Sequence, residues 1–421
     1  MQIFSSLHRH RNNYQLSIVD CSLRQLFPCT LIIAIPQAPL PSPQPPAPSP
    51  TFTAMLSRVT AAFERQDYDT AAKVLQQLLL DSPEDPWVQF YWGQLHEVTG
   101  DLAVAANVYQ QLLRNTINSK ILAQARQGWQ RVEVLLEQQR QQAIAQATSD
   151  PSDTQIGVLV LEPVANESKT QAAQKFAQIM QVDPYTARLV LPSRSWRLYR
   201  CGAIGELRFL GQQLRNSGVP CFWAKIAQIQ KIRVFQVNYF QSATPAATVV
   251  CQNEQGQLGS LTFNWSEVSQ RVAGLLPIFE QVVDVDVRGK LQRKTQTQDY
   301  AHFCDLHLSD RNCILRLCDR TYQFHHGMMF DSSHQPSSQM TSTINWNHLT
   351  NFLNQQLSGA YWSDFTPFAE TALEQINSFN DFPSHIHLLR RDATDWDPAF
   401  HLYSGLIFVQ GLEAKDVGRA L

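Results

Sequence analysis

Two stretches of this sequence repeat each other at an offset of 34 residues: FERQDYDTAAKVLQQLLLDSPEDP and HEVTGDLAVAANVYQQLLRN. At that offset Ala71 aligns with Ala105 and Leu75 aligns with Tyr109, so small and bulky residues recur in the same places. A repeat of this length is a supersecondary unit that buries its apolar face only against a neighbouring copy. The period therefore predicts stacked helical hairpins.

The two copies resemble the tetratricopeptide repeat, a helix–turn–helix unit of the same length. The residues that carry the resemblance are Trp92, Gly93, Gly100, Ala105 and Tyr109 in the second copy, and Ala71, Leu75 and Pro83 in the first. The resemblance implies inner helices that line a groove for a peptide, with Gln89, Tyr91 and His96 as lining residues. Val59 stands where the second copy has its small residue, Gly93, so an unrelated four-helix packing stays open as an alternative.

The segment 1–54 differs from the rest of the chain because it is rich in proline, as in PQAPLPSPQPPAPSP, which favours an extended backbone. It is open to three interpretations: a secretory signal, a proline-rich ligand or linker, or a stretch outside the folded protein caused by a start assigned too early. Met55 opens the first helical pattern, so we expect structure to begin there. Residues 55–148 then form the repeats and a capping helix, SKILAQARQGWQRVEVLLEQQRQQAIAQA.

Three further regions follow, and the predicted fold class is multidomain, with all-α repeats followed by α+β regions. Residues 155–228 predict a small α+β domain, residues 229–330 a β-rich α+β domain, and residues 341–413 a C-terminal α+β segment packed on the preceding domain. Within them we expect a hairpin of TVVC and SLTF and a second hairpin of CILRLC and TYQF. We also expect a helix over SEVSQRVAGLLPIFEQ, with Ser266 as its N-cap, and final strands over SHIHLLRR and HLYSGLIFVQ.

Residues with metal-ligating chemistry are present, but their spacing argues against a metal site. His302, Cys304, His307, Cys313, Cys318, His325 and His326 contain no C-x-x-C pair, and two-residue alternation puts Cys313 and Cys318 on opposite faces of a strand. Asp284 with Asp286, and His385 with His387, are interpreted as solvent-facing pairs. The sequence predicts no metal, no cofactor and no catalytic residues, since the nucleotide, protease and hydrolase motifs are absent.

Composition limits the class of protein. Hydrophobic residues make up 44% of the chain and charged residues 17%, which is typical of a folded protein. A net charge of −2 argues against general nucleic-acid binding, which requires clustered positive charge. The apolar run LFPCTLIIAI is too short to span a membrane, and eight dispersed cysteines favour a reduced, cytoplasmic setting.

We therefore expect a protein-interaction or scaffold protein that binds a partner polypeptide through its repeats, without catalysis. One alternative is an enzyme or small-molecule sensor in residues 155–413, recruited by the repeats. A second is an RNA- or ribosome-associated factor that uses the arginines of SRSWRLYR and RGKLQRK.

Overall fold

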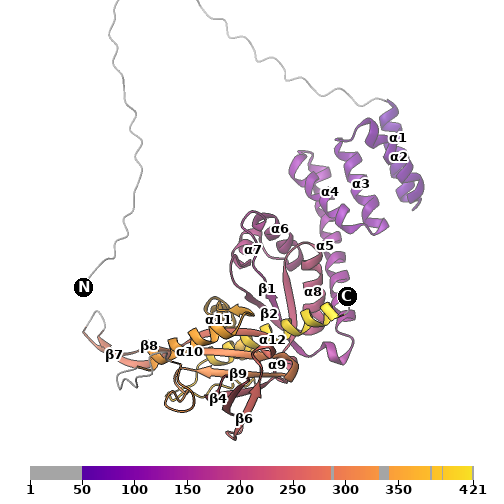
Figure 1. Ribbon diagram of the computed structural model, residues 1–421. Helices are drawn as coiled ribbons and strands as arrows, with labels where there is room; N and C mark the ends of the chain where they lie inside the picture. The colour runs from indigo at the N-terminus through magenta and orange to yellow at the C-terminus, as the bar shows by residue number, and fades with distance from the viewer. Residues whose placement is uncertain (1–49, 286–288, 331–340, 380–381, 391, 420–421) are drawn as a thin grey trace, which may run out of the picture. The chain divides into compact units, whose positions relative to one another are not determined.

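The computed structural model (Figure 1) describes residues 50–285, 289–330, 341–379, 382–390 and 392–419. The chain divides into two compact units between Leu95 and His96, a point that lies inside one helix. The described fold is a mixture of helices and strands, with consecutive helices first and α+β structure after them. Each unit is described separately below.

The first unit consists of α1 (Pro50–Glu64), α2 (Tyr68–Asp81) and the part of α3 (Pro86–Thr99) that ends at Leu95. Its core is formed by Val59, Val74, Leu75, Leu78, Val88 and Leu95. The side chain of Asp67 accepts a hydrogen bond from the Thr70 backbone N–H and so caps α2. Helix α1 begins at Pro50, before the Met55 where the sequence analysis placed the start of structure.

The helices repeat with the period of the sequence. Helix α4 (Leu102–Asn115) starts and ends 34 residues after α2, and it is followed by the long helix α5 (Ser119–Ala147). The turns before α2 and α4 also match, because Gln66 has φ of 58° and Gly100 has φ of 89°. Glycine adopts this left-handed backbone without strain, whereas glutamine does so at a cost.

After a short 3₁₀ turn (Pro151–Asp153), the second unit continues with a three-stranded antiparallel sheet in the order β2-β1-β3. Its strands are β1 (Ile156–Leu161), β2 (Arg197–Ala203) and β3 (Cys221–Lys225). Helices α6 (Lys169–Met180), α7 (Pro184–Val190) and α8 (Ile204–Asn216) pack on one face of this sheet, around Phe176, Leu207 and Leu210.

The next sheet has seven strands in the order β10-β7-β8-β9-β4-β5-β6. The pairs β10–β7 and β4–β9 are parallel and the other pairs are antiparallel. The strands are β4 (Arg233–Ser242), β5 (Ala247–Gln252), β6 (Leu258–Phe263), β7 (Gln270–Val285), β8 (Leu291–Leu308), β9 (Cys313–Cys318) and β10 (Ala360–Trp362). The predicted hairpin of TVVC and SLTF is confirmed as β5 and β6.

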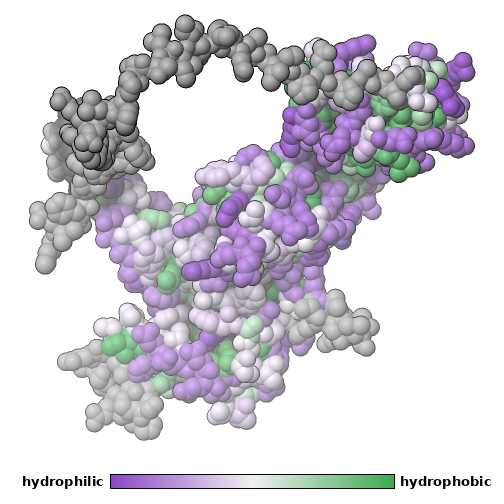
Figure 2. Space-filling view, turned by 90° about the horizontal axis from the view of Figure 1, so that it is seen from above, coloured by the Kyte–Doolittle hydropathy of each residue, from purple (hydrophilic) through white to green (hydrophobic). Residues whose placement is uncertain are grey.

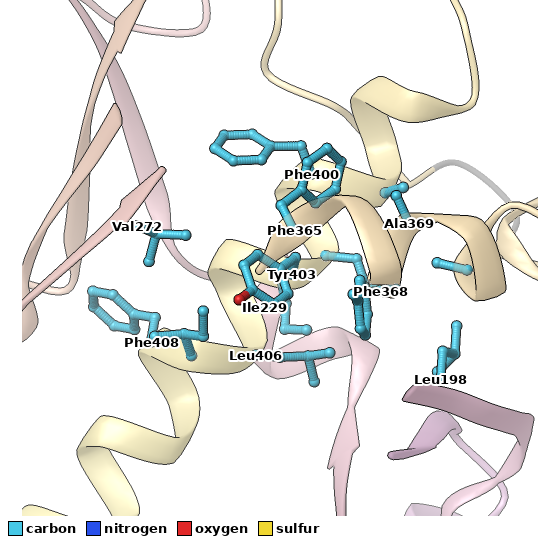
Figure 3. Packing of buried hydrophobic residues seen from close by; sticks show 14 of the residues in the cluster. Leu198, Ile229, Val272, Phe365, Phe368, Ala369, Phe400, Tyr403, Leu406 and Phe408 are labelled. Atoms are coloured by element: carbon cyan, nitrogen blue, oxygen red, sulfur yellow. The ribbon is translucent and has the colours of Figure 1, made fainter. Parts of the chain in front are cut away.

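Helices cover both faces of this sheet. On one face, α10 (Ser342–Gln356) buries Trp346, Leu349 and Leu353. On the other face, α9 (Ile226–Ile229), α11 (Phe365–Ala372) and α12 (Trp396–Arg419) build a core that also includes residues of the three-stranded sheet. Figure 3 shows this core, with side chains from α11 (Phe365, Phe368), α12 (Phe400, Tyr403, Leu406, Phe408) and β7 (Val272). Short 3₁₀ turns occur at Trp265–Glu267, Ser309–Arg311 and Ile376–Ser378.

Four predicted elements were wrong. The helix predicted to start at Ser266 is instead strand β7. This strand accommodates Pro277 because β10 pairs with β7 only at residues 270–272, so at Pro277 β7 is hydrogen-bonded to β8 alone among the described strands. The apolar stretch HLYSGLIFVQ, predicted to be a strand, lies in helix α12, where it is buried on all sides. The stretches SHIHLLRR and TYQF contain no strand among their described residues.

Candidate functional site

The two predicted groove residues of the first unit contact neighbouring parts of that unit. The Gln89 side-chain amide donates a hydrogen bond to the Pro83 carbonyl. The hydroxyl oxygens of Tyr91 and Thr60 lie 2.9 Å apart, and the Tyr91 ring stacks on Phe63 with centroids separated by 5.6 Å. Tyr91 therefore joins α3 to α1. Whether it and Gln89 also line a groove for a peptide stays a prediction.

In the second unit, the C-terminal end of α3 is linked to α4 and α5 by a polar cluster. The buried Tyr109 hydroxyl donates to Glu97 Oε2 at 2.8 Å, and burial raises the pKa of this phenol. Glu97 also accepts two bonds from Arg131, from Nε at 2.7 Å and from Nη2 at 3.0 Å. His96, the third predicted groove residue, has Nδ1 at 3.2 Å from Asp101 Oδ2.

The repeat signature coincides with close packing. Ala71, Leu75, Ala105 and Tyr109 are fully buried, Gly93 is buried, Trp92 is half-buried, and Pro83 and Gly100 lie in exposed turns. A Cβ built on Gly128 of α5 would lie only 2.6 Å from the Tyr109 ring. The helices α4 and α5 can approach this closely because Gly128 has no side chain.

One side of α5 forms a shallow trough in the second unit. The trough has a volume of about 580 Å³ and is lined by Glu97 and Arg131, by the glutamines 127, 130 and 138, and by two apolar side chains, Val134 and Leu135. Val134 is 57% exposed and Leu135 is 39% exposed. An exposed apolar pair beside amide groups can bury carbon and hydrogen-bond a peptide backbone at the same time.

A different side of α5 borders a larger cleft of about 890 Å³, which also lies within the second unit. Trp129 and Leu136 from α5, Ile179 from α6 and Phe209 from α8 contribute its apolar lining. The Gln181 side-chain amide donates to Glu137 Oε2 at 3.0 Å, also within this lining. Trp129 and Leu136 share helical spacing with the buried residues Ile121, Ala125 and Val132 of α5, but they are only half-buried.

A serine, a histidine and an aspartate meet in the core of the α+β region, but their geometry does not suit catalysis. Ser404 Oγ donates to Asp305 Oδ2 at 2.6 Å, and His307 Nε2 lies 2.9 Å from Ser404 Oγ. Because the hydroxyl proton is donated to Asp305, His307 Nε2 must itself donate and cannot serve as the base for Ser404. Arg316 donates from Nε and Nη2 to the two oxygens of Asp305.

These four side chains are at most 1% exposed. Burial lowers the pKa of His307 to about 4, so its imidazole is neutral. We interpret the cluster as a structural network that ties β8 and β9 to α12.

Cysteines and histidines that were considered as metal ligands lie on both faces of the seven-stranded sheet. Cys304 and Cys313 belong to the core under α10, whereas Cys318 belongs to the opposite core, so the prediction that Cys313 and Cys318 face opposite ways is confirmed. His307 reaches Ser404 on the α12 side and cannot pair with Cys304. In the described part of the chain, no three His, Cys, Asp or Glu side chains are grouped closely enough to hold a metal ion.

The remaining predicted candidates are dispersed. Asp284 lies on β7 opposite Gln292, and Asp286 lies outside the described residues. His385 and His387 contribute with Glu254 to a cavity of about 370 Å³, and the His385 backbone has φ of 52° instead of the extended strand geometry that was predicted. The described cysteines are all free thiols, and burial raises the pKa of Cys304 to about 12.

Basic residues of SRSWRLYR and RGKLQRK belong to different sheets. Arg197 and Arg200 lie on β2 of the three-stranded sheet, whereas Lys294 lies on β8 of the seven-stranded sheet. Arg200 is already paired with Glu206 at 3.0 Å.

Sequence reasoning missed one group of polar side chains. Arg271, Asn354 and Tyr361 share a cavity with His302 and Cys304, next to helix α10. The wrong helix prediction concealed Arg271, because strand alternation puts its side chain on the same face of the sheet as Cys304, whereas a helix would not.

Among the described residues, no helix is both long enough and apolar enough to cross a membrane. No family model matches the chain, and no curated protein or solved structure is significantly similar to it. The fold therefore defines the class only as a protein of mixed α+β structure with N-terminal helical hairpins.

Proposed function

We propose that this protein binds a partner polypeptide through its N-terminal helical repeats and the helix α5 that follows them, and acts as a scaffold, without catalysis of its own. The observation that carries the proposal is the trough on α5, where Val134 and Leu135 are exposed next to three glutamines. Figure 2 also shows hydrophobic patches among the N-terminal helices on the face drawn. Contiguous exposed apolar surface is a frequent feature of protein interaction sites.

The partner segment that suits this trough is uncharged and carries apolar side chains. The two charged residues of the lining, Glu97 and Arg131, neutralise each other through a two-fold hydrogen bond. The glutamine amides can donate to and accept from a peptide backbone, while Val134 and Leu135 provide the apolar contact. Charged side chains of a partner would lose water here without gaining an opposite charge.

The proposal can be tested by selecting binding peptides from a random displayed library on the full-length protein. Burying the exposed part of Val134 and of Leu135 contributes about 1 kcal/mol each. The double variant Val134→Ser with Leu135→Ser should therefore bind a selected peptide roughly thirtyfold more weakly. The matched control is Leu258→Ser, at a side chain that is 65% exposed on β6.

Selected peptides that bind the double variant and the parent protein equally well would contradict the proposal, and so would a selection that enriches no peptide. A second candidate function, a small-molecule sensor in the α+β region, is favoured by the cavity next to α10.

A further inference from the structure

A cavity of about 400 Å³ lies between helix α10 and the face of the seven-stranded sheet that α10 covers. Residues of β7 and β8 line it from the sheet, and Trp346, Thr350 and Asn354 line it from α10. Tyr361, Ser363 and Thr366, which are exposed, complete the lining. We propose that this cavity binds a small organic anion that joins one carboxylate or phosphate group to an apolar body. This inference does not depend on the proposed function of the repeats.

The charge of the lining favours an anion. Arg271 and His302 line the cavity, and none of the lining residues is Asp or Glu. The Arg271 guanidinium is held in place by two neutral groups: Nη2 donates to Asn354 Oδ1 at 2.6 Å, and the guanidinium carbon lies 4.2 Å from the centroid of the Tyr361 ring. Among the described residues, no carboxylate lies within ion-pair distance of Arg271.

Arginine presents five N–H donors in a planar fork that matches the two oxygens of a carboxylate or phosphate. Because Asn354 takes one of these donors, the others are available to a ligand. The stacking on Tyr361 and the bond to Asn354 fix the orientation of the fork before a ligand arrives, which reduces the entropy lost on binding.

His302 provides a second oriented group. Its Nδ1 lies 3.0 Å from Asp319 Oδ2, and its backbone N–H donates to Asp319 Oδ1, also at 3.0 Å. These two contacts with Asp319 fix the orientation of the imidazole ring, and Nε2 is the ring nitrogen that remains for a ligand. Asp319 itself is not part of the lining, so its charge does not oppose an anion directly.

The rest of the lining suits the apolar body of the ligand and provides no nucleophile in its reactive form. Trp346 and Leu275 contribute carbon surface. Cys304 is buried and, with its raised pKa, stays a neutral thiol. The volume is that of a site for a metabolite-sized molecule. We therefore assign the cavity to binding and not to covalent chemistry.

The test is isothermal titration calorimetry of the full-length protein with benzoate and phenyl phosphate, with benzylamine as the cationic counterpart of benzoate. We expect at least one anion to bind and benzylamine not to bind. Comparison of benzoate with phenyl phosphate then distinguishes a carboxylate ligand from a phosphate ligand. Arg271→Gln should weaken the binding of that anion at least tenfold, because the charge-assisted hydrogen bonds are lost.

Arg200→Gln is the matched control, since Arg200 is a half-exposed arginine on the other sheet, and it should leave anion binding unchanged. His302→Gln, at a side chain that is 43% exposed, should also weaken binding and keeps the test decisive if Arg271→Gln does not fold. The inference is overturned if none of the anions binds at millimolar concentration, if benzylamine binds as tightly as benzoate, or if the folded Arg271 and His302 variants bind as the parent does.

Discussion

The buried ion pair between Arg316 and Asp305 permits a quantitative test of how the α+β core is held together. Arg316 is 1% exposed, and besides Asp305 it donates from Nη1 to the backbone carbonyl oxygens of Ser384, at 2.9 Å, and His385, at 3.3 Å. It thus joins β9 to β8 and to the segment before α12. Replacing Arg316 with methionine removes these bonds and leaves the Asp305 carboxylate in the core with the Ser404 hydroxyl.

Breaking a buried pair by removal of one partner costs about 3–5 kcal/mol, because the remaining charge is desolvated and uncompensated. For a unit of several hundred residues this lowers Tm by roughly 4–7 °C. We expect that loss for Arg316→Met in differential scanning calorimetry of the full-length chain, in the transition that belongs to the second unit. The double variant Asp305→Leu with Arg316→Met should lose less than either single variant, because no charge stays buried alone.

The control is Arg200→Met, which breaks an ion pair with Glu206 at half-exposed positions and should cost at most about 1 kcal/mol. The stabilising role of the Arg316–Asp305 pair would be refuted if Arg316→Met lowered Tm no more than Arg200→Met does. It would also be refuted if the double variant lost the sum of the two single losses, since independent groups add.

Two further predictions concern pH and the repeat turns. The pKa of His307, which faces Asp305 and Arg316, is lowered from an ordinary value near 6.5 to about 4 by burial, so between these two values the unfolded chain binds a proton that the folded protein does not. The free energy of unfolding should therefore fall by roughly 3 kcal/mol from this group as the pH drops from 6.5 to 4. Urea titrations at several pH values should show a smaller fall for His307→Gln. A pH dependence that is the same in this variant and in the parent protein would contradict the lowered pKa of His307. In the turns, residues 66 and 100 both have positive φ, which glycine adopts without strain. Gly100→Ala should therefore destabilise the protein by about 1 kcal/mol, and Gln66→Gly should stabilise it by up to about 1 kcal/mol. Effects of the same sign and size in thermal unfolding would refute this role of the positive φ.

Elements with a strong local signal could be predicted from the sequence. The period of 34 located α2 and α4 together, because each copy must present the same buried positions to its neighbours. Two-residue alternation placed Cys313 and Cys318 on opposite faces of β9. The spacing of Trp346, Leu349 and Leu353 is that of one helix face, and all three are buried in α10.

Other elements depended on tertiary contacts that periodicity does not report. A continuous apolar run such as HLYSGLIFVQ looks the same whether it forms a central strand or a helix buried on every side. It is a helix here, and α12 comes so close to α9 that a Cβ on Gly405 would lie 2.3 Å from Ile229. For β7, Pro277 was the missed signal, because proline breaks a helix interior but is accepted where a strand lacks a partner.

The candidate sites were harder to predict than the fold because their residues are not periodic. Helix α5 buries Ile121, Ala125 and Val132, which recur at helical spacing, and this spacing identifies only the face that packs. The spacing does not distinguish among the other positions, which are all expected to face solvent. It therefore does not identify Val134 and Leu135 as an exposed apolar pair among glutamines. The residues of the proposed anion cavity are hard to identify for the same reason. Arg271, His302 and Asn354 come from three separate elements, and Arg271 and Asn354 each look like an ordinary surface residue of its own element. These residues have in common only the cavity that they line, and the cavity forms only when α10 packs on the sheet. Local sequence patterns could therefore identify helices and strands, but not the place where the fold brings these polar groups together.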